Sequence, residues 1–270
     1  MKKITDSDYS LPEIYAQRFN ENFSHSANKP VLLSGIDKHS HEKGDFVVKL
    51  KNAGRMSADA SMRELVASFI AMQMDIPVVE PVIIEITPAF VNLLTGNESW
   101  ALASKSLGNN YGSRYIPEHI TNILNKGLNN HQLPLAQDIF VFDMFIQNTD
   151  RTNVKPNLFS NGNDMIIFDH ESAFAFAFPL TTATNIWEMK EAHKAWIRHH
   201  CLLPEIRGKV FDFEEFSAKL DNLTDSFWDK AAQLIPPDWQ SDQFTTIKNT
   251  LSQICENRKH FILELKKIMS

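Results

Sequence analysis

Carboxylate and amide side chains that could bind a metal ion gather in one stretch, "NTDRTNVKPNLFSNGNDMIIFD", residues 148–169. Within it, "NGND" is a strong signal for a tight β-hairpin turn between two apolar arms. Such a hairpin would place Asn157 and Asp169 on opposite arms near its open end, where both oxygens could face one cation beside Asp150. The residue types therefore predict a magnesium site next to a carboxylate. The structural alternative is that Asn148 to Asp150 form only a helix end and a turn.

A lysine and a glutamate upstream complete the set of groups that phosphoryl transfer from ATP requires. Lys49 lies in the apolar run "FVVKL", so its ammonium would either extend to solvent or point into a cleft. Glu64 lies on a predicted helix and could pair with Lys49. However, Ser61 and Glu64 also fit a capping box, whereas a helix that begins near Ser57 would let Glu64 reach Lys49. In phosphoryl transfer from ATP, a lysine neutralises the phosphates and an acidic residue holds that lysine in place. An Asp orients or deprotonates the attacking hydroxyl, and an Asn and an Asp bind magnesium. The order of these residues predicts an ATP- and magnesium-dependent enzyme.

The loop "SGIDKHSHEKGD" is a weaker candidate for phosphate binding. Its backbone amides could form an anion-binding nest, which makes Gly35, Lys38, His39 and Ser40 candidate phosphate contacts. The sequence of this loop matches neither GxxxxGK[ST] nor GxGxxG. A plain hairpin loop is therefore the favoured alternative.

The elements that would position these groups are strands early in the chain and helices later. Apolar or β-branched runs bounded by turn residues predict strands over residues 30–36, 45–51, 78–86 and 100–107. An apolar face at helical spacing predicts one helix among them, formed by Met62, Leu65, Val66, Phe69 and Ile70. The sequence thus indicates an α+β fold.

The later part of the chain is predicted to be mainly helical. Residues 139–146 are apolar on nearly all sides except at Asp143, which predicts a buried helix that leads into residues 148–169. A final apolar pattern covers residues 247–268, with a gap at Arg258. It predicts a packed terminal helix, and a short coiled coil with a partner is the alternative.

Composition and charge narrow the class of protein. Of the 270 residues, 43% are hydrophobic, enough for a sizeable core, and the formal net charge is −6. This charge argues against binding to nucleic-acid phosphates, so no direct nucleic-acid partner is expected. There is no apolar run typical of a signal peptide or a membrane helix, and we expect a cytoplasmic protein without membrane association. Cys201 and Cys255 are expected to be reduced thiols, and the run from His199 to Cys201 lacks a second ligand pair for zinc.

These motifs carry a family resemblance. "NTDRTNVKPNLF" with "IIFDH" resembles the catalytic loop and metal-binding segment of the HipA-like kinases, and "FVVKL" and "RELVASFIAMQMDIPVVEP" are similar to that family's lysine strand and glutamate helix. The resemblance implies a two-lobed, protein-kinase-like α+β fold with ATP between the lobes. The N-lobe would span residues 1–104 and the helical C-lobe residues 105–270. With a hinge over residues 104–108, adenine would be expected against the backbone of Ser104, Lys105 and Ser106.

The resemblance also assigns roles to single residues. Asp150 would be the catalytic base, and Asn157 and Asp169 would be the magnesium ligands. Lys49 would contact phosphate, with Glu64 as its partner. Arg151 would anchor the catalytic loop rather than touch the substrate.

Two departures from the family pattern affect this assignment. The family's metal-binding Asn stands where this sequence has Lys155, so Asn157 implies a longer loop and Lys155 could contact the transferred phosphate. His170 and Glu171 replace the Phe-Gly of protein kinases. Glu171 could add a carboxylate to the metal site, but a pair with a surface cation is the favoured prediction.

The resemblance favours a protein Ser or Thr as phosphate acceptor, including the protein itself, and a small antitoxin partner within a toxin–antitoxin pair. A kinase for a small molecule is one alternative. A nucleotide-binding pseudokinase or regulatory module, inactivated by its altered loop, is another. A metal-dependent nuclease that uses Asp150, Asp169 and Glu171 is a third, although the acidic net charge disfavours it.

Overall fold

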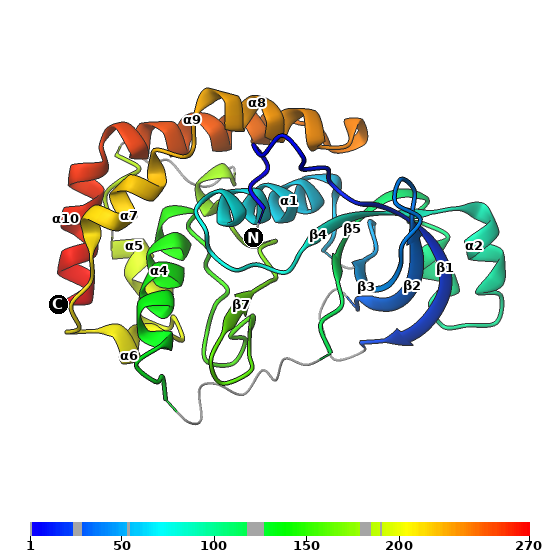
Figure 1. Ribbon diagram of the computed structural model, residues 1–270, viewed down its shortest axis with the longest axis horizontal. Helices are drawn as coiled ribbons and strands as arrows, with labels where there is room; N and C mark the ends of the chain where they lie inside the picture. Colours follow the sequence, from blue (N-terminus) through cyan, green and yellow to red (C-terminus); the bar gives the residue numbers. More distant parts are fainter. Residues whose placement is uncertain (1, 24–28, 53–54, 118–126, 179–184, 190) are drawn as a thin grey trace.

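The computed structural model describes residues 2–23, 29–52, 55–117, 127–178, 185–189 and 191–270. The fold is α+β, as the sequence predicts. Most strands gather at one end of the molecule and most helices at the other, with the helix Ala58–Gln73 (α1) between them (Figure 1). None of the helices in these ranges has the length and apolar run needed to cross a bilayer.

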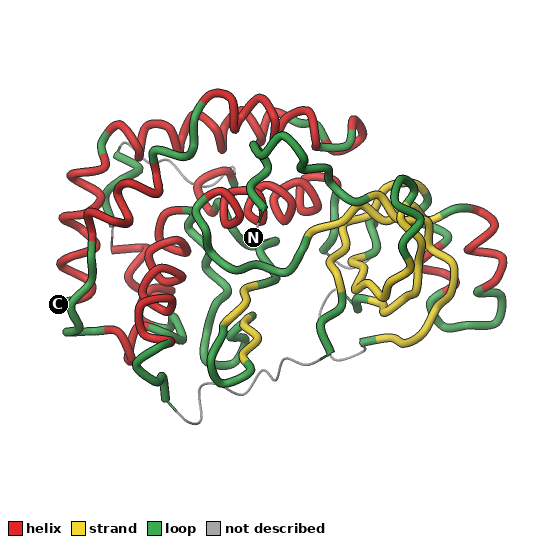
Figure 2. The backbone as a smooth tube through the Cα atoms, viewed as in Figure 1, coloured by secondary structure: helices red, strands yellow, loops and turns green. Residues whose placement is uncertain are grey.

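Five strands close into a barrel: Glu13–Asn22 (β1), Val31–Asp37 (β2), Lys43–Lys49 (β3), Pro81–Ile86 (β4) and Gly108–Arg114 (β5). Their order is β1-β2-β3-β5-β4, and the parallel pairing of β4 with β1 closes it (Figure 2). Alternate residues such as Leu33 and Val48 fill the interior. At Gly35 a Cβ atom would lie 2.4 Å from a methyl carbon of Ile14, so β1 can approach β2 closely only at a glycine.

The strand predictions over residues 30–36, 45–51 and 78–86 are confirmed within a few residues, but the one over residues 100–107 is wrong. The helices Pro88–Leu93 (α2) and Trp100–Ala103 (α3) occupy this part of the chain. The next segment, Gly108–Arg114, is rich in residues that are common in turns, but it forms β5 because its small residues fit between β3 and β4. At Gly112, for example, a Cβ atom would lie 2.6 Å from Ile84. The strand region therefore extends past the expected boundary at residue 104, to Arg114.

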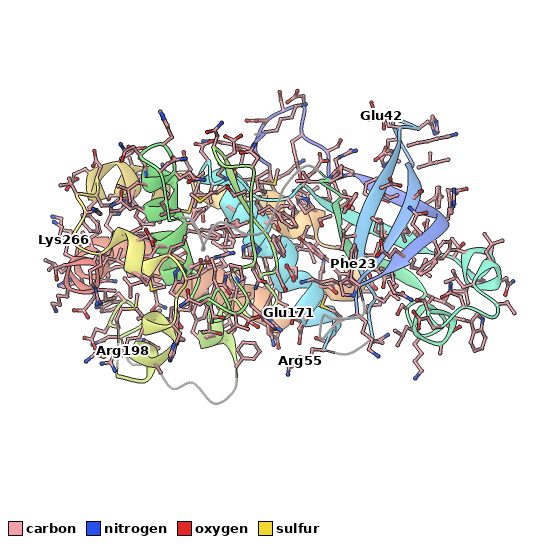
Figure 3. The ribbon with its side chains drawn as sticks, turned by 90° about the horizontal axis from the view of Figure 1, so that it is seen from below. Phe23, Glu42, Arg55, Glu171, Arg198 and Lys266 are labelled. Carbon is pink, nitrogen blue, oxygen red and sulfur yellow. The ribbon has the colours of Figure 1, made fainter. Side chains whose placement is uncertain are left out.

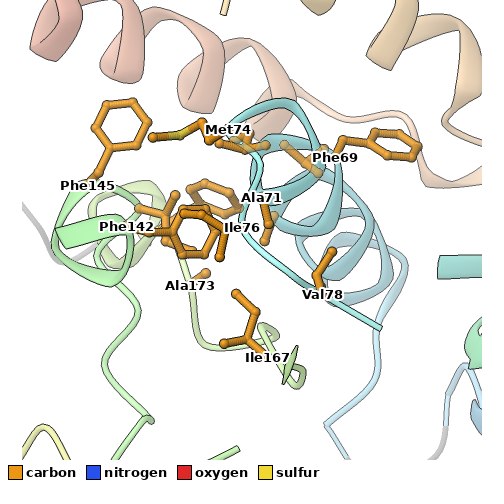
Figure 4. Close-up of a cluster of buried hydrophobic side chains, with 14 of the residues drawn as sticks. Phe69, Ala71, Met74, Ile76, Val78, Phe142, Phe145, Ile167 and Ala173 are labelled. Carbon is orange, nitrogen blue, oxygen red and sulfur yellow. The ribbon is translucent and has the colours of Figure 1, made fainter. Parts of the chain in front are cut away.

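Helix α1 begins after Ser57, whose side chain accepts a hydrogen bond from the Ala60 amide at 3.1 Å. The apolar face predicted for this helix is buried, but so is nearly every other residue of α1, because it lies between the barrel and the other helices. Figure 4 shows the end of α1 packed against Phe142 and Phe145 of helix Gln132–Phe145 (α4). This shared core fixes α1 relative to the segment that follows α4.

The predicted hairpin after α4 is confirmed as Leu158–Ser160 (β6) and Met165–Ile167 (β7). The Ile167 amide donates to the Pro77 carbonyl at 2.9 Å, and the Val79 amide donates to the Ile167 carbonyl at 3.0 Å. The hairpin is thereby attached to the chain between α1 and β4.

The remaining elements cover the far side of α1 and α4. They are Ala175–Ala177 (η1), Glu191–Arg198 (α5), Leu203–Ile206 (α6), Phe213–Leu220 (α7), Asp225–Leu234 (α8), Pro237–Trp239 (η2), Asp242–Glu256 (α9) and Arg258–Met269 (α10). The single terminal helix predicted over residues 247–268 is two helices that meet at Asn257. The apolar positions of the pattern from Ile247 to Leu265 are buried as predicted, whereas Ile268 is only partly buried.

Candidate active site

Lys49, Glu64 and Asp169 meet where β3, α1 and the β6–β7 hairpin come together. Lys49 ends β3, and its Nζ donates to Glu64 Oε1 on α1 and, at 2.5 Å, to Asp169 Oδ1 just after β7. The Lys49 side chain is only 12% exposed and the Glu64 side chain is fully buried. The predicted Lys49–Glu64 ion pair is confirmed. The capping-box alternative fails because α1 starts after Ser57, one turn earlier than it requires.

Burial and charge act in opposite directions on these three groups. Burial alone would lower the pKa of Lys49, but Glu64 and Asp169 raise it above its ordinary value. Burial raises the pKa of Glu64 to about 7, against the attraction of Lys49. Burial also disfavours the ionised form of Asp169, yet Lys49 outweighs it and keeps the pKa of that carboxyl below its usual value. The site therefore holds a charged ammonium beside an ionised carboxylate at neutral pH.

Glu171 contributes a third carboxylate to this site. Its Oε2 lies 3.7 Å from Lys49 Nζ, and its side chain is 13% exposed. Arg63 of α1 holds the segment, because its Nε donates to the Glu171 carbonyl at 3.0 Å. Oxygens of Glu64, Asp169 and Glu171 lie within 4.8 Å of one another, close enough to share one cation. Glu171 therefore lies inside the site, and its predicted pair with a surface cation stays a prediction.

A buried polar network anchors the loop that carries Asp150. Arg151 is 1% exposed, and its guanidinium bonds to both carboxylate oxygens of Asp143 on α4 and to the Asn157 carbonyl. His200 Nε2 donates to Asp143 at 3.0 Å, since its Nδ1 already accepts from the Leu202 amide. Although burial disfavours the charged form of Asp143, Arg151 and His200 hold the pKa of that carboxyl well below its usual value. Arg151 therefore fixes the loop from inside, away from any substrate.

The turn after Arg151 brings Lys155 next to Asp150. The Thr152 amide donates to the Lys155 carbonyl at 2.9 Å, and the Lys155 amide donates to Thr152 Oγ1 at 3.2 Å. This reciprocal pair directs Lys155 Nζ to 3.4 Å from Asp150 Oδ2, and both side chains remain partly exposed. Asn157 Nδ2 is 3.5 Å from the Asp150 carbonyl. Asp150 thus has two neighbours on one short loop: the Lys155 ammonium beside its carboxylate and the Asn157 amide beside its carbonyl.

Asn157 and Asp169 stand on opposite arms at the open end of the hairpin, where the sequence places them. Both have left-handed backbone, with φ of 45° and 62°. Asn and Asp adopt this conformation more readily than other residues with a side chain, and here the Phe168 amide donates to the Asn157 carbonyl at 3.2 Å.

The predicted phosphate contacts Gly35, Lys38, His39 and Ser40 are wrong. Strand register places the β2–β3 turn at the barrel end opposite Lys49, and Figure 3 shows Glu42 of this turn far from Glu171. The turn's amides are also occupied, because the Asp37 carboxylate accepts from His39 and Ser40 at 2.8 and 2.7 Å. Lys38 pairs with Glu13 and Glu85.

The predicted hinge over residues 104–108 is also wrong. Ser104, Lys105 and Ser106 precede β5, which still belongs to the barrel. Ser106 is buried with its hydroxyl bonded to the carbonyls of Lys51 and Leu102, and the Lys105 carbonyl accepts from Asn52 at 3.0 Å. The chain leaves the barrel only after Arg114.

Sequence reasoning missed Asp143 and His200, which support the loop that carries Asp150. Asp143 carried a usable signal, because a lone carboxylate in an apolar buried helix requires a partner. His200 carried none, since its partner lies far away in the sequence.

A buried lysine held by carboxylates, beside an anchored Asp loop and metal-ligand side chains, is the arrangement found in phosphoryl-transfer sites. The family model of the HipA-like kinases matches residues 38–261, a range that contains all of these groups. The chain therefore belongs to the HipA-like kinase family. A comparison with curated proteins gave no match.

Proposed function

We propose that this protein transfers the terminal phosphoryl group of ATP, with Mg²⁺, to a Ser or Thr hydroxyl of a protein. The observation that carries the proposal is the contact of Lys49 with both Glu64 and Asp169, which joins three distant segments into one charged site. In a two-lobed, kinase-like arrangement, ATP would lie between the barrel and the helical region. The backbone that follows Arg114, at Tyr115 and Ile116, is our candidate for adenine contact.

Each residue in the proposed reaction acts through charge or position. Lys49 would contact phosphate oxygens, with Glu64 keeping its ammonium in place. Asp150 would accept the proton of the attacking hydroxyl, while Arg151 and Asp143 hold its loop. Lys155 lies where it could approach the transferred group.

The donor set fits magnesium, which prefers oxygen ligands. Asp169 and Glu171 carry carboxylates close to each other, and Asn157 supplies an amide on the facing hairpin arm. These residues would hold the ion, which would supply charge neutralisation for the phosphates when bound.

One observation favours a second candidate, a nucleotide-binding pseudokinase. Lys155, which replaces the family's metal-binding Asn, lies 3.4 Å from the Asp150 carboxylate. A substrate hydroxyl would have to displace this ammonium to reach the same carboxylate oxygen.

Labelled ATP tests both candidates. Wild type, Asp150→Asn and Asp169→Asn are incubated with magnesium and a cell extract, and label is followed into protein, small molecules and nucleotide products. We expect either substitution to lower transfer to protein by about 10²-fold or more.

Asp225→Asn is the control: the Asp225 side chain is 97% exposed, and this variant should match wild type. Undiminished transfer by Asp150→Asn would contradict the kinase proposal, while ATP binding without transfer by wild type would favour the pseudokinase. Label in a small molecule alone would change the acceptor class.

A further inference from the structure

An apolar groove of about 440 Å³ adjoins the catalytic loop. The loop forms one side and the end of α5 the other, and the lining includes Thr149, Thr152, Val154, Ala195, Trp196 and His199. The groove lies apart from the group of Lys49, Glu64 and Asp169, because none of these residues lines it.

Backbone contacts fix the two sides of the groove to each other. Thr152 and His200 form an antiparallel bridge, and the Cys201 amide donates to the Arg151 carbonyl at 3.0 Å. The reciprocal bonds between Thr152 and Lys155 then raise Val154 at the tip of the turn, where it is 92% exposed. An apolar, β-branched side chain thus stands exposed in an otherwise polar catalytic loop.

The groove begins next to the proposed catalytic base. Thr149 lines it and is bonded directly to Asp150. Because an extended peptide advances about 3.3 Å per residue, a side chain about one to three residues from an acceptor hydroxyl at Asp150 would reach the groove.

An exposed cation stands at the α5 side of the groove. None of the described residues that line the groove carries a carboxylate, and the side chain of Arg198, in the last turn of α5, is exposed. This arrangement favours a ligand that combines an apolar side chain with neighbouring acidic ones.

We propose that this groove binds the acceptor segment of a protein substrate, with an apolar side chain against Val154 and Trp196 and acidic residues beside Arg198. The inference rests on the proposed function and specifies its substrate class.

Arrayed peptides with one central serine test the inference. At each flanking position they carry Leu or Gly, and Glu or Lys, and transfer of label from magnesium-ATP is measured. We expect wild type to prefer Leu with Glu by about tenfold in kcat/KM, and Val154→Asp to lose the preference for Leu by raising KM. Val210→Asp is the matched control, because Val210 is 96% exposed on the segment between α6 and α7 and should retain the wild-type preference. Nucleotide affinity of each variant checks that it is folded.

Charge reversal gives an independent outcome. Arg198→Glu is expected to shift the preference from Glu toward Lys at one flanking position. Transfer by wild type without any peptide preference, transfer only to the protein itself, or the same preference in Val154→Asp would overturn the inference and leave the proposed function standing. Absence of transfer to any peptide, to the protein itself or to extract proteins would overturn the proposed function and this inference together.

Discussion

At the scale of single residues, the interior below the loop that carries Asp150 is unusual because it holds a buried ion pair and a histidine bonded to it. Asp143, Arg151 and His200 are all nearly inaccessible to solvent. Buried charges are costly unless every partner is in place, so such a network is weak evidence for stability but fixes the position of its members. Here the fixed members are the two ends of the loop, Arg151 and the carbonyl of Asn157. The network is therefore best understood as a device that positions Asp150.

This network predicts how stability depends on pH. Burial lowers the pKa of His200 from its ordinary value of 6.5, even though Asp143 favours the charged form. Below about pH 6.5 the unfolded chain binds a proton at this residue that the folded protein does not. The free energy of unfolding should therefore fall as the pH falls, by up to about 1.4 kcal/mol per pH unit for one histidine. His200→Gln should reduce this slope in urea titrations.

The exposed neighbour His199 provides the control, because His199→Gln should keep the wild-type slope. Buried His170, whose pKa burial lowers to about 3, should leave part of the slope in both variants. Identical slopes in His200→Gln and wild type would contradict the assignment.

At the scale of elements, the close approach of neighbouring strands explains two incorrect expectations, those for β5 and for Gly35. Gly35 and Gly112 lie where a side chain would meet a neighbouring strand. From sequence propensity, a glycine indicates a turn or a phosphate-binding loop. In this barrel, glycine instead allows neighbouring strands to pack closely. The strand β5 was hidden for this reason, and Gly35 was assigned to phosphate. The hairpin and α1 were predictable because their signals, a turn motif and an apolar face, are local.

The groups of the candidate site were predictable to a similar degree. Lys49, Glu64, Asp150 and Asp169 were found because their types and order suit one reaction. Strand register determines which loop lies near these residues, and contacts across the fold determine which residues support them. Local sequence patterns predict neither of these.

Gly35→Ala should destabilise the protein by about 1–3 kcal/mol, because its Cβ atom would overlap Ile14 and the Tyr15 carbonyl. KM for ATP should not change, since the residue lies mid-strand and away from Lys49. Denaturant titration and kinetics measure the two effects. Gly44→Ala is the comparison: it stands opposite Gly35, and its nearest contact would be the milder 3.1 Å to Phe46. A raised KM for ATP with unchanged stability would restore Gly35 as a phosphate contact.

At the scale of the whole molecule, the site joins the barrel, α1 and the helical region. A ligand that binds only this assembled site stabilises the fold as a whole. Magnesium-ATP at about 100 times its Kd should therefore add about 2.7 kcal/mol to the free energy of unfolding.

Thermal melts with and without magnesium-ATP measure this gain. Asp169→Asn should lose most of it, because it removes a proposed metal ligand, whereas Asp225→Asn should keep it. Equal shifts in all three proteins would place the nucleotide elsewhere.

The parallel contact between β1 and β4 has a consequence for how this protein meets other proteins. It covers three residues of each strand, Glu13–Tyr15 of β1 and Ile83–Glu85 of β4, so among the described strands the rest of β1 pairs only with β2. A strand of a partner could therefore pair with this sheet along the part of β1 that follows Tyr15. Where a strand is paired on both sides, recognition must depend on side chains and on the loops between strands.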